Sequence, residues 1–317
     1  MKRPLIIVTG PTAVGKTSLS IDLARAVNGE IISADSMQVY RHMDIGSAKV
    51  TQEEKRGIFH HLIDVLEPYE DFNVTVFQSM AKQALEGIYD RGHIPIVAGG
   101  TGFYIQALLY DIDFKENDNS QAIRQELEAL CEERGNEYVH ELLCRADPEA
   151  ARQIHANNRK RMIRALEYYR MTGEPISKHN EDERKKESPY RFCYFVLNCD
   201  RKRLYERIDQ RVDEMIHAGL VDEVKKLRDM GCRQGMVSMQ GLGYKEILDY
   251  LDGKWDLEEA VRVLKRDTRH FAKRQLTWFR RERDVKWVEL EPFEFNGEKV
   301  LEYIMEELEK EKIIERT

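Results

Sequence analysis

The sequence of 317 residues has no apolar run long enough to cross a bilayer, which excludes proteins with helical membrane spans. Two basic residues lie within Met1 to Pro4, but the next apolar run covers only Leu5 to Val8, so we expect no signal peptide. Cysteine is scarce: there are five residues and no C-x-x-C pair, which disfavours a disulfide framework or a zinc site. We therefore expect a cytoplasmic chain with free thiols and no membrane partner.

The chain also lacks an excess of positive charge, with 50 Lys and Arg against 57 Asp and Glu and a net charge of −7. This balance disfavours binding of polyanions by the whole surface, so any nucleic-acid contact has to be local. Apolar residues make up 42% of the chain, enough to bury a full core, and the length allows either two domains or one domain with an insertion. We expect a globular monomer.

The most specific motif is Gly10-Pro-Thr-Ala-Val-Gly-Lys-Thr17, which follows the apolar run Leu5–Val8 and precedes a helical pattern. A strand, a Gly-rich turn and a helix N-terminus aim several backbone N–H groups at one point, which attracts phosphate. Chance occurrence is the alternative, and the flanking strand and helix disfavour it. We predict that Lys16 reaches the distal phosphate and that Thr17 coordinates Mg²⁺. The phosphate-binding candidates are Gly10, Pro11, Thr12, Ala13, Val14, Gly15, Lys16 and Thr17.

Strand and helix patterns alternate through the first hundred residues. Apolar runs predict strands at 5–8, 30–34, 61–65 and 94–98, and again at 192–197 and 285–290. Thr51 with Glu54 predicts a short capped helix, and Asn73 predicts the start of a longer one. We predict an α/β fold with a P-loop NTPase-like parallel sheet, flanked by helices.

The alternation stops at Asp113, and the apolar spacing is helical from there to about Pro189. We therefore predict an inserted all-helical domain at 113–189, between a first part of the P-loop core at 1–112 and a core continuation with basic helices at 190–317. Within the insertion, the mixed charges of 181–187 predict a solvated loop.

Ligands of parallel sheets bind at the carboxyl ends of the strands, so the residues after each strand are the informative ones. Three loops follow strands there, and we number them along the chain: the first is Gly10–Thr17, the second begins at Asp35 and the third begins at Gly99. Asp35 is the only carboxylate among the first residues of these loops, and it is a candidate general base or metal ligand. The alternative is that Asp35 only caps the next segment. Thr101 lies between glycines, and we expect its hydroxyl to hold a second side of the phosphate; a simple tight turn is the alternative.

Two later stretches concentrate positive charge. Arg159 to Arg164 is strongly basic, and a helix beginning at Asp256 has nine Lys and Arg between Arg262 and Arg283, interleaved with aromatic residues such as Phe271 and Trp278. Such a surface suits gripping of a nucleic-acid backbone and stacking of bases. A solvated amphipathic helix with aromatic residues in the core is the alternative. The arginines between Arg201 and Arg211 are mostly expected to form a solvated face.

Taken together, these segments resemble bacterial tRNA dimethylallyltransferases, prenyltransferases that modify an adenosine next to the anticodon. The matching segments occur in order over nearly the whole chain, apart from Ser47 and Val50, where Thr and Pro are expected, and Arg159-Lys160, where the family more often has Gln beside Arg. The segments are Gly10–Thr17, Asp35–Arg41, Asp44–Lys49, His60–Asp64, Val97–Tyr104, Arg164–Glu167 and Lys273–Arg280.

The resemblance implies that dimethylallyl diphosphate places its diphosphate in the Gly10–Thr17 loop, with Mg²⁺ on Thr17 and diphosphate as the leaving group. Asp35 is implied as the base for the exocyclic amine, with Lys16, Thr101 and an arginine aligned to Arg207 stabilising the leaving oxygen. The implied tRNA contacts, in the helical insertion and elsewhere, are Asp35, Ser36, Met37, Gln38, Thr101, Arg124, Lys160, Arg161, Arg164, Lys273, Arg274, Gln275 and Arg280.

Three other functions are compatible with the phosphate loop. A P-loop kinase for a small molecule or nucleotide needs a lid with arginines that closes on ATP, and ATP turnover would identify it. A nucleotide-regulated RNA-binding protein would bind RNA without forming a product. A prenyltransferase for free AMP differs only in the acceptor, and the basic segments favour a large RNA acceptor instead.

Overall fold

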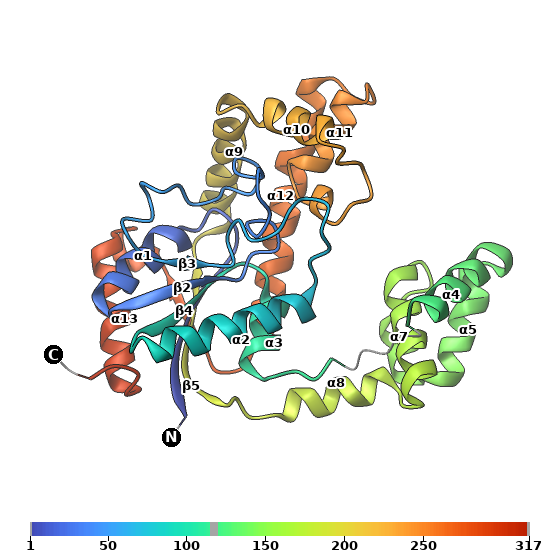
Figure 1. The fold of residues 1–317 in the computed structure, drawn as a ribbon, viewed down its shortest axis with the longest axis horizontal. Coiled ribbons are helices and arrows are strands. Elements are labelled where there is room, and N and C mark those ends of the chain that lie inside the picture. The colour runs from blue at the N-terminus through green and yellow to red at the C-terminus, as the bar shows by residue number, and fades with distance from the viewer. Residues whose placement is uncertain (1, 115–119, 316–317) are drawn as a thin grey trace. The chain divides into compact units, whose positions relative to one another are not determined.

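The structure, a computed structural model, describes residues 2–114 and 120–315. The chain divides into two compact units (Figure 1). Unit 1 comprises Met1–Leu109 with Pro189–Thr317, and unit 2 comprises Tyr110–Ser188. These bounds lie within a few residues of the predicted ones at 112 and 189, and residues 115–119 of the predicted insertion lie outside the described residues.

Unit 1 contains a six-stranded parallel sheet in the order β3-β2-β4-β1-β5-β6, which confirms the predicted fold class. The register places Ile7 of β1 between Val97 of β4 and Tyr194 of β5. Central strands of such a sheet are covered on both faces, so they are continuous apolar runs in the sequence. The strands are β1 (Arg3–Thr9), β2 (Gly29–Ser33), β3 (His60–His61), β4 (Ile94–Gly99), β5 (Tyr190–Asn198) and β6 (Val285–Glu289).

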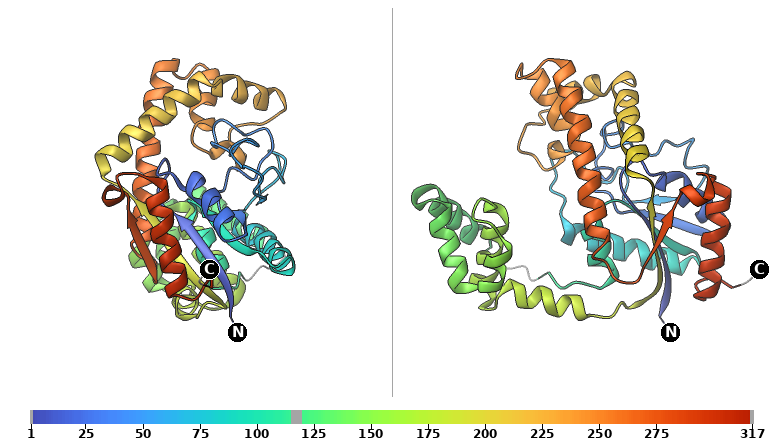
Figure 2. Two further views of the ribbon diagram at one scale, coloured as in Figure 1. Left: turned by 90° about the vertical axis from the view of Figure 1, so that its left-hand side faces the viewer. Right: turned by 180° about the vertical axis from the view of Figure 1, so that it is seen from behind.

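Helices cover both faces of this sheet (Figure 2). On one face, helices α1 and α13 share a buried core with Ile6 and Val8 of β1. No residue of α2 belongs to this core, and α2 packs against β2, β4 and α3. No helix in the described ranges is both long enough and apolar enough to span a membrane. The helices of unit 1 are α1 (Lys16–Ala26), α2 (Val74–Asp90), α3 (Gly102–Leu109), α9 (Arg201–His217), α10 (Leu220–Asp229), α11 (Tyr244–Leu251), α12 (Leu257–Phe279) and α13 (Gly297–Lys310), with short 3₁₀ turns η1 (Ser238–Gln240) and η2 (Glu291–Phe293).

Unit 2 is helical throughout its described part, with its own core around Leu127, Leu143 and Met162. Asp147 is fully buried, and its carboxylate accepts bonds from Ala150 N and from both Oγ and N of Ser177. This carboxylate caps α6 and also ties it to the start of α8. The helices are α4 (Ser120–Arg134), α5 (Asn136–Ala146), α6 (Pro148–Gln153), α7 (Arg159–Thr172) and α8 (Ile176–Lys185).

Three local predictions were wrong. The strand predicted at 61–65 is limited to His60–His61, because Leu62 and Asp64 have φ values of 63° and 56°, outside the extended region. Thr51 and Glu54 form both bonds of a capping box, but turns rather than a helix follow them. The loop predicted at 181–187 is helical as far as Lys185, supported by ion pairs one turn apart such as Glu181–Lys185.

Candidate active site

The loop from Gly10 to Gly15 connects β1 to α1 at the carboxyl edge of the sheet. Gly10 has a φ of 145°, and a Cβ there would lie 2.4 Å from the Leu197 carbonyl oxygen, so only glycine fits this turn. Gly15 precedes α1, whose first N–H groups receive no side-chain cap. These unpaired donors, together with the positive end of the helix dipole, make the loop an anion-binding site.

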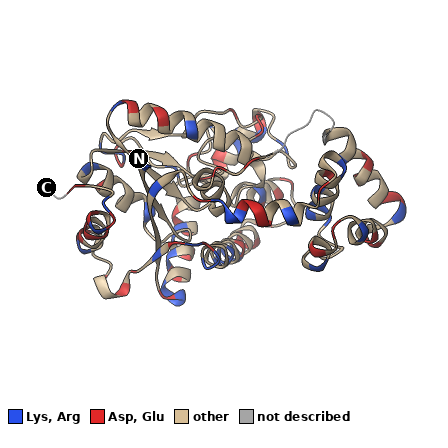
Figure 3. Cartoon of the chain, turned by 90° about the horizontal axis from the view of Figure 1, so that it is seen from below, with Lys and Arg blue, Asp and Glu red and all other residues tan. Residues whose placement is uncertain are grey.

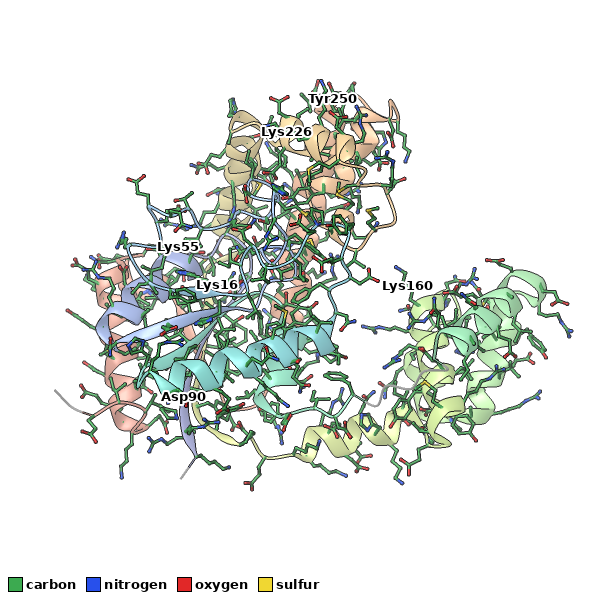
Figure 4. The ribbon with its side chains drawn as sticks, viewed as in Figure 1. Lys16, Lys55, Asp90, Lys160, Lys226 and Tyr250 are labelled. Atoms are coloured by element: carbon green, nitrogen blue, oxygen red, sulfur yellow. The ribbon has the colours of Figure 1, made fainter. Side chains whose placement is uncertain are left out.

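Lys16 is the first residue of α1, and Figure 4 labels its position. Its Nζ donates to the carbonyl oxygens of Gly10 at 3.1 Å and Pro11 at 2.8 Å. Burial, reinforced by the nearby Arg211 charge and opposed by Asp35, lowers the pKa of Lys16 to about 7. An anion bound in the loop would raise this pKa, because a negative charge favours the protonated amine. A bound anion therefore favours the charged form of Lys16.

Asp35 lies two residues beyond the end of β2. Its Oδ1 accepts hydrogen bonds from the backbone N–H groups of Met37 at 2.8 Å and Gln38 at 3.3 Å. Within the described residues, Oδ2 has no hydrogen-bond partner. The capping role and the catalytic role that the sequence left open are therefore compatible, because each uses a different oxygen.

Thr101 lies between the end of β4 and the start of α3. Its backbone N donates to Ala34 O at 3.2 Å, and its own carbonyl oxygen accepts from Tyr104 N and Ile105 N in the first turn of α3. Because Ala34 directly precedes Asp35, these bonds bring the third loop against the second.

A cavity of about 550 Å³ opens where the three loops meet. Its polar wall includes Lys16 and Thr17 from the first loop, Asp35 to Gln38 from the second and Thr101 from the third. Helices α9 and α12 contribute apolar side chains such as Val212 and Leu264, and also the charged side chains of Arg211 and Arg274. The structure therefore brings Asp35, Thr101 and four of the predicted phosphate-binding residues, Thr12, Ala13, Lys16 and Thr17, into one cavity, whereas Gly10, Pro11, Val14 and Gly15 do not line it.

A network that the sequence analysis missed supports the second loop. Gln38 Nε2 donates to Ala48 O at 3.2 Å, and its Oε1 accepts from Ser33 Oγ at 3.1 Å. Further along the chain, the carboxylate of Glu223 in α10 accepts from the backbone N–H groups of residues 44–46, at 2.8 to 3.1 Å. No sequence pattern indicated these contacts, because Glu223 lies far from the loop in the chain.

Arg207 and Arg211 lie one turn apart on α9. Arg207 is exposed, and its Nε donates to Ala13 O at 2.8 Å, which ties it to the first loop. Arg211 lines the cavity, where burial lowers its pKa and the Asp35 charge opposes that shift. The sequence analysis assigned a role to Arg207 only, although the four-residue spacing already placed Arg211 on the same helix face.

The basic segment of α12 has two different halves. In the C-terminal half, Lys273, Arg274 and Arg280 are exposed and have no ion pair within the described residues. Arg274 lines the main cavity, whereas Lys273 and Arg280 border a second cavity of about 450 Å³. In the N-terminal half, the ion pairs are Arg262–Glu259, Lys265–Asp213, Arg266–Asp267 and Arg269–Asp209. The positive charge available to a ligand is therefore concentrated after residue 270.

Figure 3 shows Lys and Arg interspersed with Asp and Glu over both units. In unit 2, Lys160, which is labelled in Figure 4, and Arg161 are exposed at the start of α7. Arg124 and Arg164 both donate to Oε2 of Glu167, at 3.1 and 3.2 Å, and the Glu167 side chain is buried. One buried carboxylate therefore fixes two guanidinium groups that remain partly exposed.

Comparison with known proteins identifies the family. The model of the IPP transferase family matches residues 38–282, and that of the isopentenyl transferase family matches residues 3–64. A tRNA dimethylallyltransferase of Lachnoclostridium phytofermentans is 59% identical over 98% of this chain and 99% of its own length.

Comparison with solved structures identifies the same family. The tRNA isopentenylpyrophosphate transferase of Bacillus halodurans is 44% identical with a TM-score of 0.72, over 98% of both chains. A eukaryotic dimethylallyltransferase acting on tRNA is 31% identical with a TM-score of 0.76, over 90% of this chain and 74% of the other. These matches confirm the resemblance seen in the sequence: the chain belongs to the IPP transferase family, whose named members include tRNA dimethylallyltransferases.

Proposed function

We propose that the chain transfers the dimethylallyl group of dimethylallyl diphosphate to the exocyclic amine of the adenosine next to the anticodon in tRNA, releasing diphosphate. The observation that carries this proposal is the single cavity lined by Lys16, Asp35 and Thr101. The phosphate-binding loop lies beside the Asp35 carboxylate, which uses only one of its oxygens in hydrogen bonds. This arrangement suits a reaction in which diphosphate departs while an amine loses a proton. The names of the relatives support the same reaction.

The diphosphate of the donor would bind the N–H groups of the first loop and Lys16. Thr17 lines the same cavity and is exposed there, so its hydroxyl oxygen is free to reach a metal. Mg²⁺ fits this donor set, because it commonly takes one or two protein oxygens and completes its octahedron with water and phosphate oxygens. When bound, Mg²⁺ supplies neutralisation of negative charge on the diphosphate.

Asp35 would act as the base. The exocyclic amine of adenine is a poor nucleophile, because its lone pair is delocalised into the ring. The C–N bond at the first allyl carbon therefore has to form together with loss of an N–H proton, which passes to Oδ2 of Asp35. The N–H groups of Met37 and Gln38 hold Oδ1 and so orient Oδ2.

The electron pair of the breaking C–O bond goes to the departing diphosphate. Lys16, Thr101 and Arg211 line the cavity, and Arg207 is tied to the first loop, so these side chains surround the site of developing negative charge. Groups that are already in place need little reorganisation as the charge develops.

The acceptor would be a single base extruded from an RNA loop, because a base stacked in a duplex cannot enter a cavity. Exposed Lys273, Arg274 and Arg280 of α12, and Lys160 and Arg161 of α7, would contact phosphates of the tRNA. We propose that the chain acts as a monomer.

One assay tests the proposal. The purified chain is incubated with labelled dimethylallyl diphosphate, Mg²⁺ and unmodified tRNA, and label is expected in the RNA with one diphosphate released per transfer. Phosphoryl transfer from ATP without the allylic donor would instead establish the kinase function. Equal turnover of AMP and tRNA would contradict the RNA acceptor and leave the diphosphate site intact.

A further inference from the structure

Gln275 lies on the buried side of α12, where its side-chain amide joins two loops of the active site. Its Oε1 accepts a hydrogen bond from Thr12 N at 2.9 Å, and its Nε2 donates to Gly100 O at 3.0 Å. The residue is only 6% exposed, so water competes poorly for these groups. One buried amide therefore links the phosphate loop to the loop that carries Thr101.

An amide is well suited to this position, because one partner is a donor and the other is an acceptor. The N–H of Thr12 has to meet the amide oxygen, and the carbonyl of Gly100 has to meet the NH₂ group. The two partners therefore also determine the orientation of the amide. A Cβ at position 100 would lie 2.2 Å from Gln275 Nε2, so the absence of a side chain at Gly100 permits this contact.

The two loops that Gln275 joins hold different groups of the proposed reaction. Thr12 belongs to the loop that ends in Lys16, and Gly100 directly precedes Thr101. A change in the separation of the loops would misalign Lys16 and Thr101 around the leaving diphosphate. Misplacement of reacting groups by about 1 Å is known to reduce turnover by about 10²-fold.

We propose that Gln275 is a positioning residue, which sets the separation of the two diphosphate-binding loops and does not contact tRNA. The inference rests on the proposed function, because turnover is its main readout. The family resemblance implied a tRNA contact for Gln275 as well as for Lys273 and Arg274. The buried position of Gln275 supports a different role, whereas Lys273 and Arg274 are exposed and keep the proposed role in tRNA binding.

The first variant is Gln275→Met, which removes both hydrogen bonds at similar volume. We expect kcat to fall by about ten- to a hundredfold, while KM for tRNA stays within about twofold. Inorganic diphosphate should bind several-fold more weakly in calorimetry, because the first loop loses its support. A raised KM for tRNA with unchanged kcat would overturn the proposal in favour of a direct RNA contact.

The second variant is Gln275→Glu, which introduces a proton-dependent donor. The ionised carboxylate accepts from Thr12 N but cannot donate to Gly100 O, and burial raises the pKa of such a carboxyl. The ratio of the Gln275→Glu kcat to the wild-type kcat should therefore rise about fivefold or more between about pH 8.5 and about pH 6, as the acid regains its donor. A ratio independent of pH would overturn the proposal.

The matched control is Gln78→Met. Gln78 in α2 is 8% exposed, and its Nε2 donates to Ala107 O at 2.8 Å, away from the active-site loops. This variant should lower the melting temperature without changing kcat. An equal loss of kcat in both Met variants would show general loosening of the core and overturn the proposal.

Failure of the proposed function can be distinguished from failure of this inference. If the wild type transferred no label to tRNA, the proposed function would fail. The affinities of the wild type and Gln275→Met for inorganic diphosphate would still test the link between the loops.

Discussion

Strand β2 has a carboxylate near each end, and the two carboxylates have different surroundings. Glu30, near its start, accepts hydrogen bonds from Arg91, His61 and His93, all at 2.7 or 2.8 Å. Asp35, just past its end, bonds two backbone N–H groups through one oxygen, and its other oxygen has no partner within the described residues. One carboxylate is fully bonded, and the other is bonded on one side only.

This difference assigns the two carboxylates different roles: Glu30 stabilises the fold, and Asp35 takes part in the proposed reaction. Hydrogen bonds from Arg91 and from the two histidines lower the pKa of Glu30 to about 2, against an opposing effect of burial. Glu30 therefore stays ionised and bonded at any pH where the chain works. In Asp35, Oδ2 is available to accept a proton, and the hydrogen bonds to Oδ1 orient the carboxylate. We expect substitutions at the two ends of β2 to affect different properties of the protein.

The largest expected effect is at Asp35. Asp35→Ala should lower kcat by about 10²- to 10⁴-fold, the usual contribution of a general base, with KM values nearly unchanged. The free energy of unfolding should change by less than about 1 kcal/mol, because only one oxygen is used in caps. Single-turnover transfer and urea unfolding measure the two quantities. Unchanged turnover would remove Asp35 from the chemistry and break the comparison.

The arginines of α9 sharpen the comparison, because only one of them lines the cavity. Arg211→Gln should lower kcat by about 10²- to 10³-fold through lost stabilisation of the leaving group, and Arg207→Gln by about tenfold. Loss of Arg211 should also raise the pKa of Lys16, since Arg211 lowers it in the wild type. pH–rate profiles of both variants provide the measurement. A larger effect of Arg207→Gln would restore the assignment made from the sequence alone.

Much of the fold could be predicted because its signals are local. The strands around 5–8, 94–98 and 192–197 are buried in a parallel sheet and are therefore apolar runs. The two-residue strand β3 could not be delimited, because its length depends on the backbone conformation of Leu62 and Asp64 and on pairing with β2. Pairing is a tertiary property, and periodicity alone does not contain it.

The same distinction explains the active site. The phosphate loop is a continuous motif, and Asp35 and Thr101 follow strands, so all three could be placed at one edge of the sheet. Gln275 contacts Thr12 across 263 residues of chain, and no local pattern indicates that partner. Arg207 and Arg211 differ by one helical turn, and the way α9 packs decides which of them lines the cavity.

Glu30 provides the opposite test to Asp35. Its folded pKa of about 2 lies below the ordinary value, so its contribution to stability is complete above about pH 4.5 and is lost as pH falls toward 2. Glu30→Gln should lower the free energy of unfolding by up to about 3 kcal/mol at neutral pH, with kcat unchanged. Urea unfolding at several pH values should show this difference shrinking below pH 4.5. A constant difference would contradict the assignment.

Thr17 tests the metal, with a smaller effect. Thr17→Ala should lower kcat at saturating Mg²⁺ by about tenfold and raise the Mg²⁺ concentration needed for half-maximal activity, because one oxygen ligand is lost. Thr17→Ser keeps the hydroxyl and is the matched control. Titration of activity with Mg²⁺ gives both values. If Thr17→Ala kept the wild-type dependence on Mg²⁺, the assignment of the metal to the Thr17 hydroxyl would be wrong.

The smallest effect on catalysis is expected at the surface, where the comparison extends to charges without fixed partners. Replacing Lys273 and Arg280 together by Glu, two residues that do not line the main cavity, should raise KM for tRNA and leave kcat and KM for the allylic diphosphate nearly unchanged. Each lost phosphate contact should also reduce the slope of log affinity against log salt by roughly one unit. The matched control replaces Arg262 and Arg266, which already bond Glu259 and Asp267 on the same helix. The same change of charge should there alter KM for tRNA much less, because these guanidinium groups are neutralised by their neighbours. Equal effects of the two double variants would mean that tRNA responds only to the net charge of α12, and the division of this helix into a paired and an unpaired half would have no consequence for binding.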